Sequence, residues 1–394
     1  MCIRERFSDK DEIITKILST KLFVGIGLIS YPLYLWHYPI FSFSRVIEFI
    51  QGDLSIKLFL VVISIILSIL SYYYIEKPAR NNKYKFINIF CIISFLILFL
   101  ITINSLSVLN KGFSSRVPEL LKNSLSQRLF FENSKGERCQ DHPDGCSFNV
   151  SSNKKIFIIG DSLMESLLYD LKERVVKKSY QFNTSIIGGC IFFPGFNTVK
   201  IKTNKITRCN NKYFSNLKDK LKKEKNSIII LGGRFPLYLT NYYFDNQEGG
   251  IEGYKDYKKL IPEGNRNNLK DLFNLSIGDI SKENYVILIY PIPEVGWNLP
   301  RKIISQINKN FLLEENQIEI TTSYEVYIKR TKSSFELLDS IQGDNIHRVY
   351  PHILFCDTSI KNRCITHDDK DIFYFDNHHL SLKGAEMVND LIMK

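Results

Sequence analysis

Two short stretches at opposite ends of the chain carry residue types suited to acyl transfer. "IFIIGDSLMES" places Ser162 directly after Gly-Asp, and "FDNHHLSLKG" places Asp376 three residues ahead of His379. A serine hydroxyl is a weak nucleophile unless a base takes its proton. A carboxylate can hold an imidazole in the tautomer that acts as this base. The two stretches together predict a nucleophile, Ser162, with His379 as its base and Asp376 as the orienting carboxylate.

The elements that must position these residues form an alternating pattern. Short runs rich in Ile and Val, typical of strands buried on both faces, are "KIFIIG" (155–160), "TSIIGG" (184–189), "SIIILGG" (227–233), "YVILIY" (285–290) and a weaker "DIFYFD" (371–376). Helix-like segments such as 162–178 lie between them, which predicts a parallel sheet with helices on both faces. Ser162 follows the first run and Asp376 the last, so both are expected at the carboxyl edge of the sheet, where sites of such folds gather.

The first 110 residues have a different character. Three apolar runs, Leu22–Phe43, Leu58–Ile75 and Phe86–Leu109, are each long enough to cross a bilayer, which takes about 20 residues. Lys and Arg gather in the leader and in "EKPARNNKYK", which favours a cytoplasmic location for both. Three crossings would place the residues after 110 on the far side of the membrane.

Cysteine usage agrees with export. Of eight cysteines, six lie beyond residue 110, in the near pairs Cys139/Cys146, Cys190/Cys209 and Cys356/Cys364. An even number in an exported domain favours disulfides. Buried free thiols and metal ligands are the alternatives, but no CxxC pair is present, so no metal site is expected. Pairing by proximity is a hypothesis, because six cysteines allow 15 connectivities.

The net charge of +11 has no clear functional meaning. Much of it is interspersed with acidic residues, as in "LKDKLKKEK", a pattern typical of a solvated helix face. No basic groove interleaved with aromatic residues is visible, so no nucleic-acid partner is expected. Anionic glycans of the cell envelope stay open as partners.

Residues 150–394 resemble the SGNH hydrolase superfamily, in which a Gly-Asp-Ser block opens the domain and an Asp-x-x-His block closes it. The resemblance implies a three-layer α/β/α, flavodoxin-like fold and catalytic roles for Ser162, His379 and Asp376. The Gly-x-Asn-Asp block is not visible, and "LGGRF" stands at the matching strand end. The oxyanion would then be stabilised by the backbone of Ser162 and Gly189, together with Arg234. Binding an acidic glycan or pairing with an internal carboxylate are open alternatives for Arg234.

A second resemblance covers the N-terminal part. "GLISYPLYLWHYPIF" (27–41) and "YYIEKPAR" (73–80) look like the last two helices of the acyltransferase-3 family of membrane O-acyltransferases. The connector "NKGFSSRVP" (110–118) and "IPEVGW" (292–297) look like the fusion of that family to an SGNH domain. This resemblance implies an N-terminally truncated fusion. Its expected parts are a two-helix acyltransferase-3 remnant (1–80), an additional transmembrane helix (81–110), a linker (111–150) and the SGNH domain (151–394).

Together the resemblances imply an O-acetyltransferase that works through a serine acyl-enzyme. Its acceptor would be an envelope polysaccharide: lipopolysaccharide O-antigen, peptidoglycan or exopolysaccharide. The protein would be multi-pass in the bacterial inner membrane, in contact with the lipid bilayer, with a periplasmic SGNH domain. No bound cofactor is expected. Acetyl-CoA would be the indirect donor, through acyltransferase-3 helices of a separate polypeptide. A membrane-anchored carbohydrate esterase and an inactive fragment are the alternatives.

Overall fold

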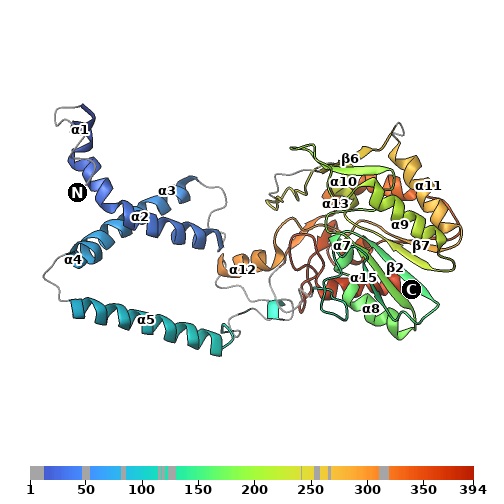
Figure 1. The fold of residues 1–394 in the computed structure, drawn as a ribbon, viewed down its shortest axis with the longest axis horizontal. Helices are drawn as coiled ribbons and strands as arrows, with labels where there is room; N and C mark the ends of the chain where they lie inside the picture. Colours follow the sequence, from blue (N-terminus) through green and yellow to red (C-terminus); the bar gives the residue numbers. More distant parts are fainter. Residues whose placement is uncertain are drawn as a thin grey trace. The chain divides into compact units, whose positions relative to one another are not determined.

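The computed structural model of the chain has two compact units, residues 1–114 and 115–394. The structure describes residues 13–46, 54–80, 86–113, 117, 120–122, 130–240, 242–252, 258–264, 268–309 and 319–394. Figure 1 shows that the first unit is made of helices and that the second is a mixed α/β structure.

Within the first unit, α2 (Lys21–Val46) packs against α3 (Leu54–Ser71). The Trp36 Nε1 donates a hydrogen bond to the Ser71 Oγ at 2.7 Å, which ties the two helices together. The other helical elements are α1 (Ile13–Leu18), a π-helical turn (Tyr72–Glu76), α4 (Lys77–Ala79) and α5 (Phe86–Leu109).

Two helices in the described residues are long and apolar enough to span a membrane, Leu54–Ala79 and Phe90–Leu109. They match the second and third predicted crossings. The first predicted crossing, Leu22–Phe43, lies inside α2, which is helical over 26 residues but is not one of these two helices. The basic leader and most of the basic loop fall outside the described residues. The three-crossing topology therefore stays a prediction.

The second unit contains, among the described residues, a six-stranded sheet with the strand order β1-β3-β2-β5-β7-β9. All neighbouring strands are parallel except β1, which pairs antiparallel with β3 at one edge. The strands are β1 (Cys146–Phe148), β2 (Lys155–Gly160), β3 (Gln181–Ile186), β5 (Ile228–Leu231), β7 (Tyr285–Ile289) and β9 (Ile346–Val349).

Side chains that alternate along β2 build two separate cores, because successive residues of a strand point to opposite faces of the sheet. Ile156 and Ile158 pack in one core, and Phe157 and Ile159 pack in the other. Figure 1 shows helices on both faces of the sheet. The first core includes α8 (Leu168–Lys177) and α15 (Leu382–Ile392), and the second includes α9 (Asn211–Lys223) and α11 (Leu269–Ser281). This is the predicted three-layer α/β/α fold.

Shorter elements complete the unit. Two small antiparallel ribbons lie outside the main sheet: β4 (Phe196–Lys200) with β6 (Lys258–Pro262), and β8 (Thr321–Ser323) with β10 (Arg363–Ile365). The remaining helices are α7 (Ser162–Glu165), α10 (Phe235–Thr240), α12 (Leu299–Lys309), α13 (Tyr324–Asp339) and α14 (His352–Phe355).

The predicted strand at 371–376 is wrong. Ile372, Phe373 and Tyr374 are buried, but this segment makes only isolated bridges and lies outside every strand. The fifth parallel strand is β9, whose sequence "IHRV" alternates apolar and polar residues and so gives no continuous apolar run. Asp376 therefore lies in a loop before α15. In addition, the predicted helix 162–178 is divided into α7 and α8.

Three disulfides join the cysteines pairwise as the proximity hypothesis proposed: Cys139–Cys146, Cys190–Cys209 and Cys356–Cys364. The first of them lies upstream of β2, in the segment that was expected to be a linker. Phe131, Cys139 and Cys146 belong to the core that packs on α8 and α15. The α/β unit therefore begins well before residue 151, and residues 130–148 are part of its fold.

Candidate active site

Ser162 stands at the carboxyl end of β2, on a turn whose tightness the sequence explains. A Cβ added at Gly160 would collide with the Gly232 carbonyl, so the chain needs glycine here. Asp161 caps α7, and its buried carboxylate accepts hydrogen bonds from the backbone N–H groups of Leu163 at 3.0 Å and Arg234 at 2.8 Å. Asp161 thereby joins the turn after β2 to the turn after β5. Burial raises the pKa of Asp161, and the two N–H groups oppose this rise.

Ser162, His379 and Asp376 meet through two hydrogen bonds. The Ser162 Oγ lies 2.8 Å from the His379 Nε2, and the His379 Nδ1 lies 2.7 Å from the Asp376 Oδ2. Since a carboxylate only accepts, the ring proton belongs on Nδ1, and Nε2 is left to accept from the serine hydroxyl. This is the tautomer that a general base requires.

The Asp376 carboxylate is fixed and charged. Its Oδ1 accepts from the backbone N–H groups of His378 at 2.9 Å and His379 at 2.8 Å. Burial raises the pKa of Asp376, but the hydrogen bond and charge of His379 together with the two backbone N–H groups outweigh burial, so the net shift is downward. The Phe375 ring stacks on the His379 ring at 5.4 Å between centroids, which restricts the orientation of the imidazole.

The loop that carries Asp376 and His379 is anchored by the segment "IPEVGW". The Asn377 carbonyl accepts hydrogen bonds from the backbone N–H groups of Val295 and Gly296, each at 3.0 Å. The Val295 carbonyl in turn accepts from the Asn246 Nδ2 at 2.8 Å. The segment "IPEVGW", which the sequence singled out only by its family resemblance, thus holds the loop that carries the candidate base.

The two backbone N–H groups predicted to stabilise the oxyanion make no hydrogen bond in the described part of the chain. Gly160 and Ile186 are register partners in the parallel pair β2–β3, so the turns that carry Ser162 and Gly189 leave the same edge of the sheet. Gly189 has φ 67°, a conformation that favours glycine. Within the described residues, neither the Ser162 N–H nor the Gly189 N–H makes a hydrogen bond. Both N–H groups are therefore free to donate, as the predicted oxyanion role requires.

Arg234 does not fit the oxyanion role. Its guanidinium is buried and donates to Glu294 through Nε at 2.6 Å and to Glu252 through Nη1 at 3.0 Å, and Nη2 contacts both carboxylates. Of the predicted alternatives, pairing with internal carboxylates is therefore the one that the structure shows. Arg330 joins the group through Glu294 at 3.1 Å.

His378 points into this ion cluster and away from the serine. Its Nδ1 lies 2.9 Å from the Asn377 Oδ1 and 3.9 Å from a Glu252 oxygen. Burial lowers the pKa of His378 well below its usual value, and the charges of Arg234 and His379 lower it further. His378 is therefore a neutral, partly buried ring.

Asp376, His378 and His379 each offer one atom that could bind a metal ion, and these three atoms lie within 4.8 Å of one another. Both nitrogens of His379 are already engaged with protein groups. The arrangement fits a proton relay better than a metal site.

A cavity of about 190 Å³ opens on the serine. Besides Ser162, Asp376 and His379, its walls are formed by Phe130, Arg138, Gln140, Glu165, Ser166 and Phe375. Sequence reasoning missed these residues. Glu165 had a weak signal, since it lies one helical turn after Ser162. The residues from 130 to 140 had none, because they fell in the expected linker.

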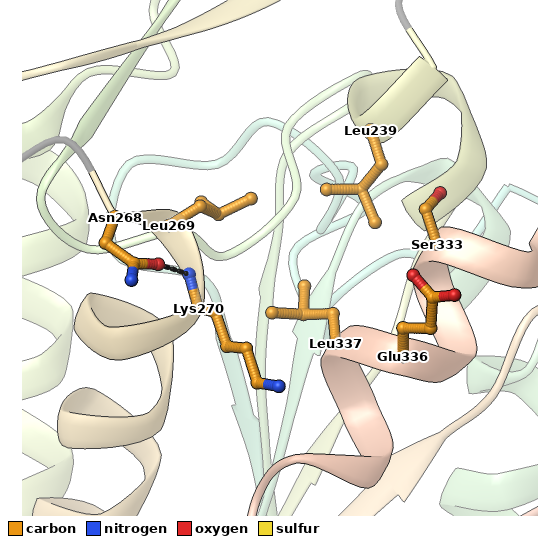
Figure 2. Close-up of a pocket in the computed structure, with 7 residues that line it drawn as sticks. All are labelled: Leu239, Asn268, Leu269, Lys270, Ser333, Glu336 and Leu337. Atoms are coloured by element: carbon orange, nitrogen blue, oxygen red, sulfur yellow. Dashed lines mark hydrogen bonds between the residues drawn. The ribbon is translucent and has the colours of Figure 1, made fainter.

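A second, larger hollow of about 590 Å³ lies between α10, α11 and α13. Figure 2 shows Leu239, Leu269 and Leu337 facing it, with Lys270, Ser333 and Glu336 at its walls. None of the predicted site residues lines it. The chemistry is concentrated in the smaller cavity.

Comparison with known proteins identifies the family of the α/β unit. Residues 131–394 match the family described as the SGNH domain fused to AT3 domains. A Staphylococcus aureus protein provisionally named an O-acetyltransferase is 28% identical over 183 residues, which are 42% of this chain and 30% of that protein. The O-acetyltransferase OatA of S. aureus is 35% identical over 75 residues, 18% of this chain and 12% of OatA.

The chain thus matches less than a third of the length of either relative. Among solved structures, the periplasmic domain of a lipopolysaccharide acetyltransferase from Salmonella ser. Paratyphi A is similar at a TM-score of 0.41 and 18% identity, over 62% of this chain and 86% of that one. The family match covers the whole α/β unit from Phe131 onward, with Ser162, Asp376 and His379 inside it. The chain belongs to the family of SGNH domains that occur fused to AT3 domains.

Proposed function

We propose that this chain is the SGNH portion of an O-acetyltransferase that acts on envelope polysaccharide through an acetyl-serine intermediate. The observation that carries the proposal is the hydrogen-bonded series from Asp376 through His379 to Ser162, at 2.7 and 2.8 Å. A series of this kind is the arrangement that makes a serine hydroxyl nucleophilic.

In the first half-reaction, the Ser162 Oγ attacks the carbonyl carbon of an acetyl donor while the His379 Nε2 takes the hydroxyl proton. The tetrahedral oxyanion accepts hydrogen bonds from the Ser162 and Gly189 N–H groups. It collapses to acetyl-Ser162, and His379 returns the proton to the leaving group. In the second half-reaction, His379 deprotonates a sugar hydroxyl, which attacks the acetyl carbon. Ser162 then leaves and regains the proton, and the sugar ester is released.

The family and the relatives named as O-acetyltransferases support transfer to a sugar. The two long apolar helices and the three disulfides support a membrane-anchored chain whose α/β unit lies outside the cytoplasm. The acetyl group would then be supplied across the membrane by acyltransferase-3 helices, with acetyl-CoA as its indirect source. Lipopolysaccharide O-antigen, peptidoglycan and exopolysaccharide are the candidate acceptors.

Hydrolysis is the second candidate, because His379 and Asp376 keep 18% and 25% of their side-chain surface exposed. Water can therefore reach the acetyl ester, and the chain would act as a membrane-anchored carbohydrate esterase. The choice depends on whether a bound sugar excludes that water.

The test uses the full-length chain purified in detergent, with 4-nitrophenyl acetate as donor. We expect slow release of nitrophenol, and Ser162→Ala should abolish it, with a loss of several orders of magnitude. Added oligosaccharides from each candidate polymer distinguish the acceptors: mass spectrometry should find an acetylated sugar for transfer, or free acetate alone for the esterase. Equal rates for the wild type and Ser162→Ala would refute both functions.

A further inference from the structure

The candidate oxyanion hole lacks a side-chain donor. Ser162 and Gly189 each offer one backbone N–H, and the Arg234 side chain is occupied by two glutamates. Besides the nucleophile Ser162 and the base His379, three of the residues that line the cavity carry a side-chain donor: Arg138, Gln140 and Ser166. Ser166 is already oriented toward the Ser162 carbonyl, at 3.5 Å. Arg138 and Gln140 remain.

Gln140 is fixed beside the Gly188–Gly189 turn. The preceding residue, Cys139, is held by its disulfide to Cys146 and by its N–H, which donates to the Phe131 carbonyl at 2.8 Å. The following residue, Asp141, donates its N–H to the Ile186 carbonyl at the end of β3 at 2.9 Å. A Cβ added at Gly188 would collide with the Gln140 Nε2. The side-chain nitrogen of Gln140 therefore lies directly against the turn that carries the Gly189 N–H.

The orientation of the Gln140 amide follows from its neighbours. Its Oε1 accepts a hydrogen bond from the Arg138 Nη2. A guanidinium can only donate, so it must face the amide oxygen, and the NH₂ end must face the other way. Arg138 is fixed in turn by Glu165, which accepts from its Nε at 3.1 Å and from its Nη2 at 3.0 Å. Within the described residues, the Gln140 Nε2 makes no hydrogen bond.

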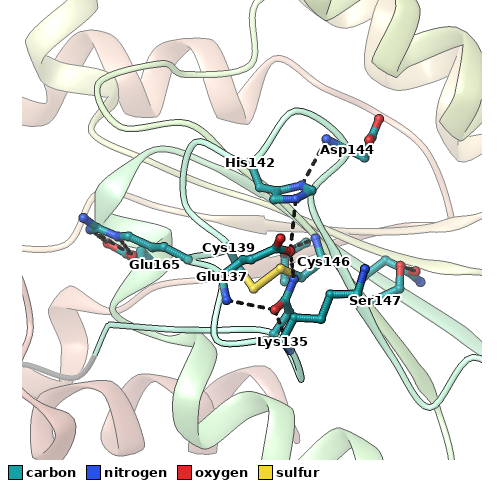
Figure 3. The surroundings of a disulfide bond; sticks show 12 residues. Lys135, Glu137, Cys139, His142, Asp144, Cys146, Ser147 and Glu165 are labelled. Carbon is teal, nitrogen blue, oxygen red and sulfur yellow. Dashed lines mark hydrogen bonds and ion pairs between the residues drawn. A yellow bond between two sulfur atoms is a disulfide. The ribbon is translucent and has the colours of Figure 1, made fainter.

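Glu165 completes the link to the nucleophile, because it lies on α7, the helix that Ser162 opens. Only 14% of its side chain is exposed. Figure 3 shows Glu165 to one side of the segment that holds the Cys139–Cys146 disulfide. The series Glu165–Arg138–Gln140 thus runs from the helix of the nucleophile to the turn of Gly189 around one wall of the cavity.

We propose that the Gln140 Nε2 is the side-chain donor of the oxyanion hole, with Arg138 and Glu165 as positioning residues. This inference rests on the proposed function. The Gln140 N–H would donate a hydrogen bond to the oxyanion in both tetrahedral intermediates, and no proton would leave the amide. A preorganised donor of this kind contributes about 10²–10³ in kcat. Gln140 would thus take the place of the asparagine that "LGGRF" lacks.

The experiment compares Gln140→Met and Gln140→Glu in the full-length chain in detergent, with 4-nitrophenyl acetate. Gln140→Met keeps the side-chain length but has no donor, so kcat should fall about 10²–10³-fold with little change in KM. Gln140→Glu keeps an acceptor for Arg138 and preserves the fold, but it replaces the donor by a negative charge. Its kcat should be at least as low as that of Gln140→Met. A purely structural glutamine would tolerate Gln140→Glu, since Arg138 pairs with a carboxylate at least as well.

Two further measurements keep the inference separate from the proposed function. Gln342→Glu, the same change at an exposed glutamine, should leave kcat unchanged. The rate at which a fluorophosphonate labels Ser162, followed by mass spectrometry, should fall in the Gln140 variants by the same factor as kcat, and it requires no turnover. If both Gln140 variants keep wild-type kcat and labelling rate while Ser162→Ala is inactive, the assignment of Gln140 is wrong and the proposed function stands. If the wild type hydrolyses nothing, the labelling rates still decide the role of Gln140.

Discussion

His378 and His379 are adjacent in sequence, and their rings lie 4.0 Å apart, yet they meet different surroundings. His379 bridges Asp376 and Ser162, whereas His378 is a partly buried, neutral ring beside Asn377 and Glu252. The Asp-x-x-His spacing selects His379 because the backbone between residues 376 and 379 forms a tight turn around the Asp376 carboxylate. The candidate base and a residue that only packs are thus direct neighbours in the sequence.

This contrast gives a test at the residue scale. His379→Ala should lower kcat for 4-nitrophenyl acetate nearly as far as Ser162→Ala, because triad members act as a unit. Asp376→Asn should cost about 10⁴-fold, since the imidazole loses its tautomer. His378→Ala should retain most of kcat and lose some thermal stability, because only a packed ring is removed. An inactive His378→Ala variant beside an active His379→Ala variant would move the site by one residue.

At the scale of elements, the site is formed by residues from several loops. The turn after β2 brings Ser162, the turn after β3 brings Gly189, and the loop before α15 brings Asp376 and His379. Asp161 and the Val295–Gly296 backbone connect these loops. In the ion cluster of Arg234, Glu252, Glu294 and Arg330, the pairing of Arg234 with Glu294 links the turn after β5 to the segment that anchors residue 377.

The sequence was informative where chemistry or burial is local. Four of the five predicted apolar runs overlap strands of the main sheet, and the triad was read from two short motifs. The strand predicted from the fifth run is absent. Ile372, Phe373 and Tyr374 are buried in a loop, and a buried loop gives the same apolar sequence pattern as a buried strand. Arg138, Gln140 and Glu165 could not be grouped beforehand, since their meeting depends on the antiparallel pairing of β1 with β3. Such pairing depends on contacts between distant segments, and no local pattern records it.

The ion cluster gives a test at this scale. Arg234→Met should destabilise the α/β unit by about 3–5 kcal/mol, because it leaves the buried Glu252 without its arginine and the buried Glu294 with Arg330 alone. Urea unfolding followed by the fluorescence of Trp297, in a Trp36→Phe background, measures the loss. Glu336→Gln, a change at an exposed residue of α13, serves as the control. A loss of less than about 1 kcal/mol would show that the cluster is dispensable.

The pH dependence of that loss has a defined sign. Burial raises the pKa of Glu294, but the charges of Arg234 and Arg330 outweigh burial and lower it overall. A carboxylate with a lowered folded-state pKa contributes stability that is present above its unfolded pKa and is lost as the pH falls through the folded value. The difference between wild type and Arg234→Met should therefore be largest at neutral pH and should shrink in acid. A difference that grows below pH 4 would contradict this assignment.

At the scale of the whole molecule, two kinds of signal agree. The first unit contains helices apolar enough to span a membrane, and all three disulfides lie in the second unit. The cysteine in α5, Cys91, is free. This division is the one expected when a membrane separates an oxidising compartment from the cytoplasm.

The corresponding test is a pair of reporter fusions. Alkaline phosphatase, which needs disulfides, should be active when fused after Lys394 and inactive when fused after Lys83. A fluorescent protein that matures only in the cytoplasm should show the opposite pattern at the same two positions. The reverse result for both reporters would refute the three-crossing topology.

The disulfide-stapled segment ahead of β2 has a consequence for how such proteins can be recombined. Residues 130–148 supply the edge strand β1, one wall of the cavity and Gln140. A chimera joined at residue 150 would therefore combine Ser162 with a cavity wall from another protein, even though both halves kept their recognisable motifs. The crossover point that keeps this unit intact lies at residue 115, where the unit begins, because Leu120 and Leu121 also pack in its core. Natural gene fusions that exchange whole modules should show their junctions there.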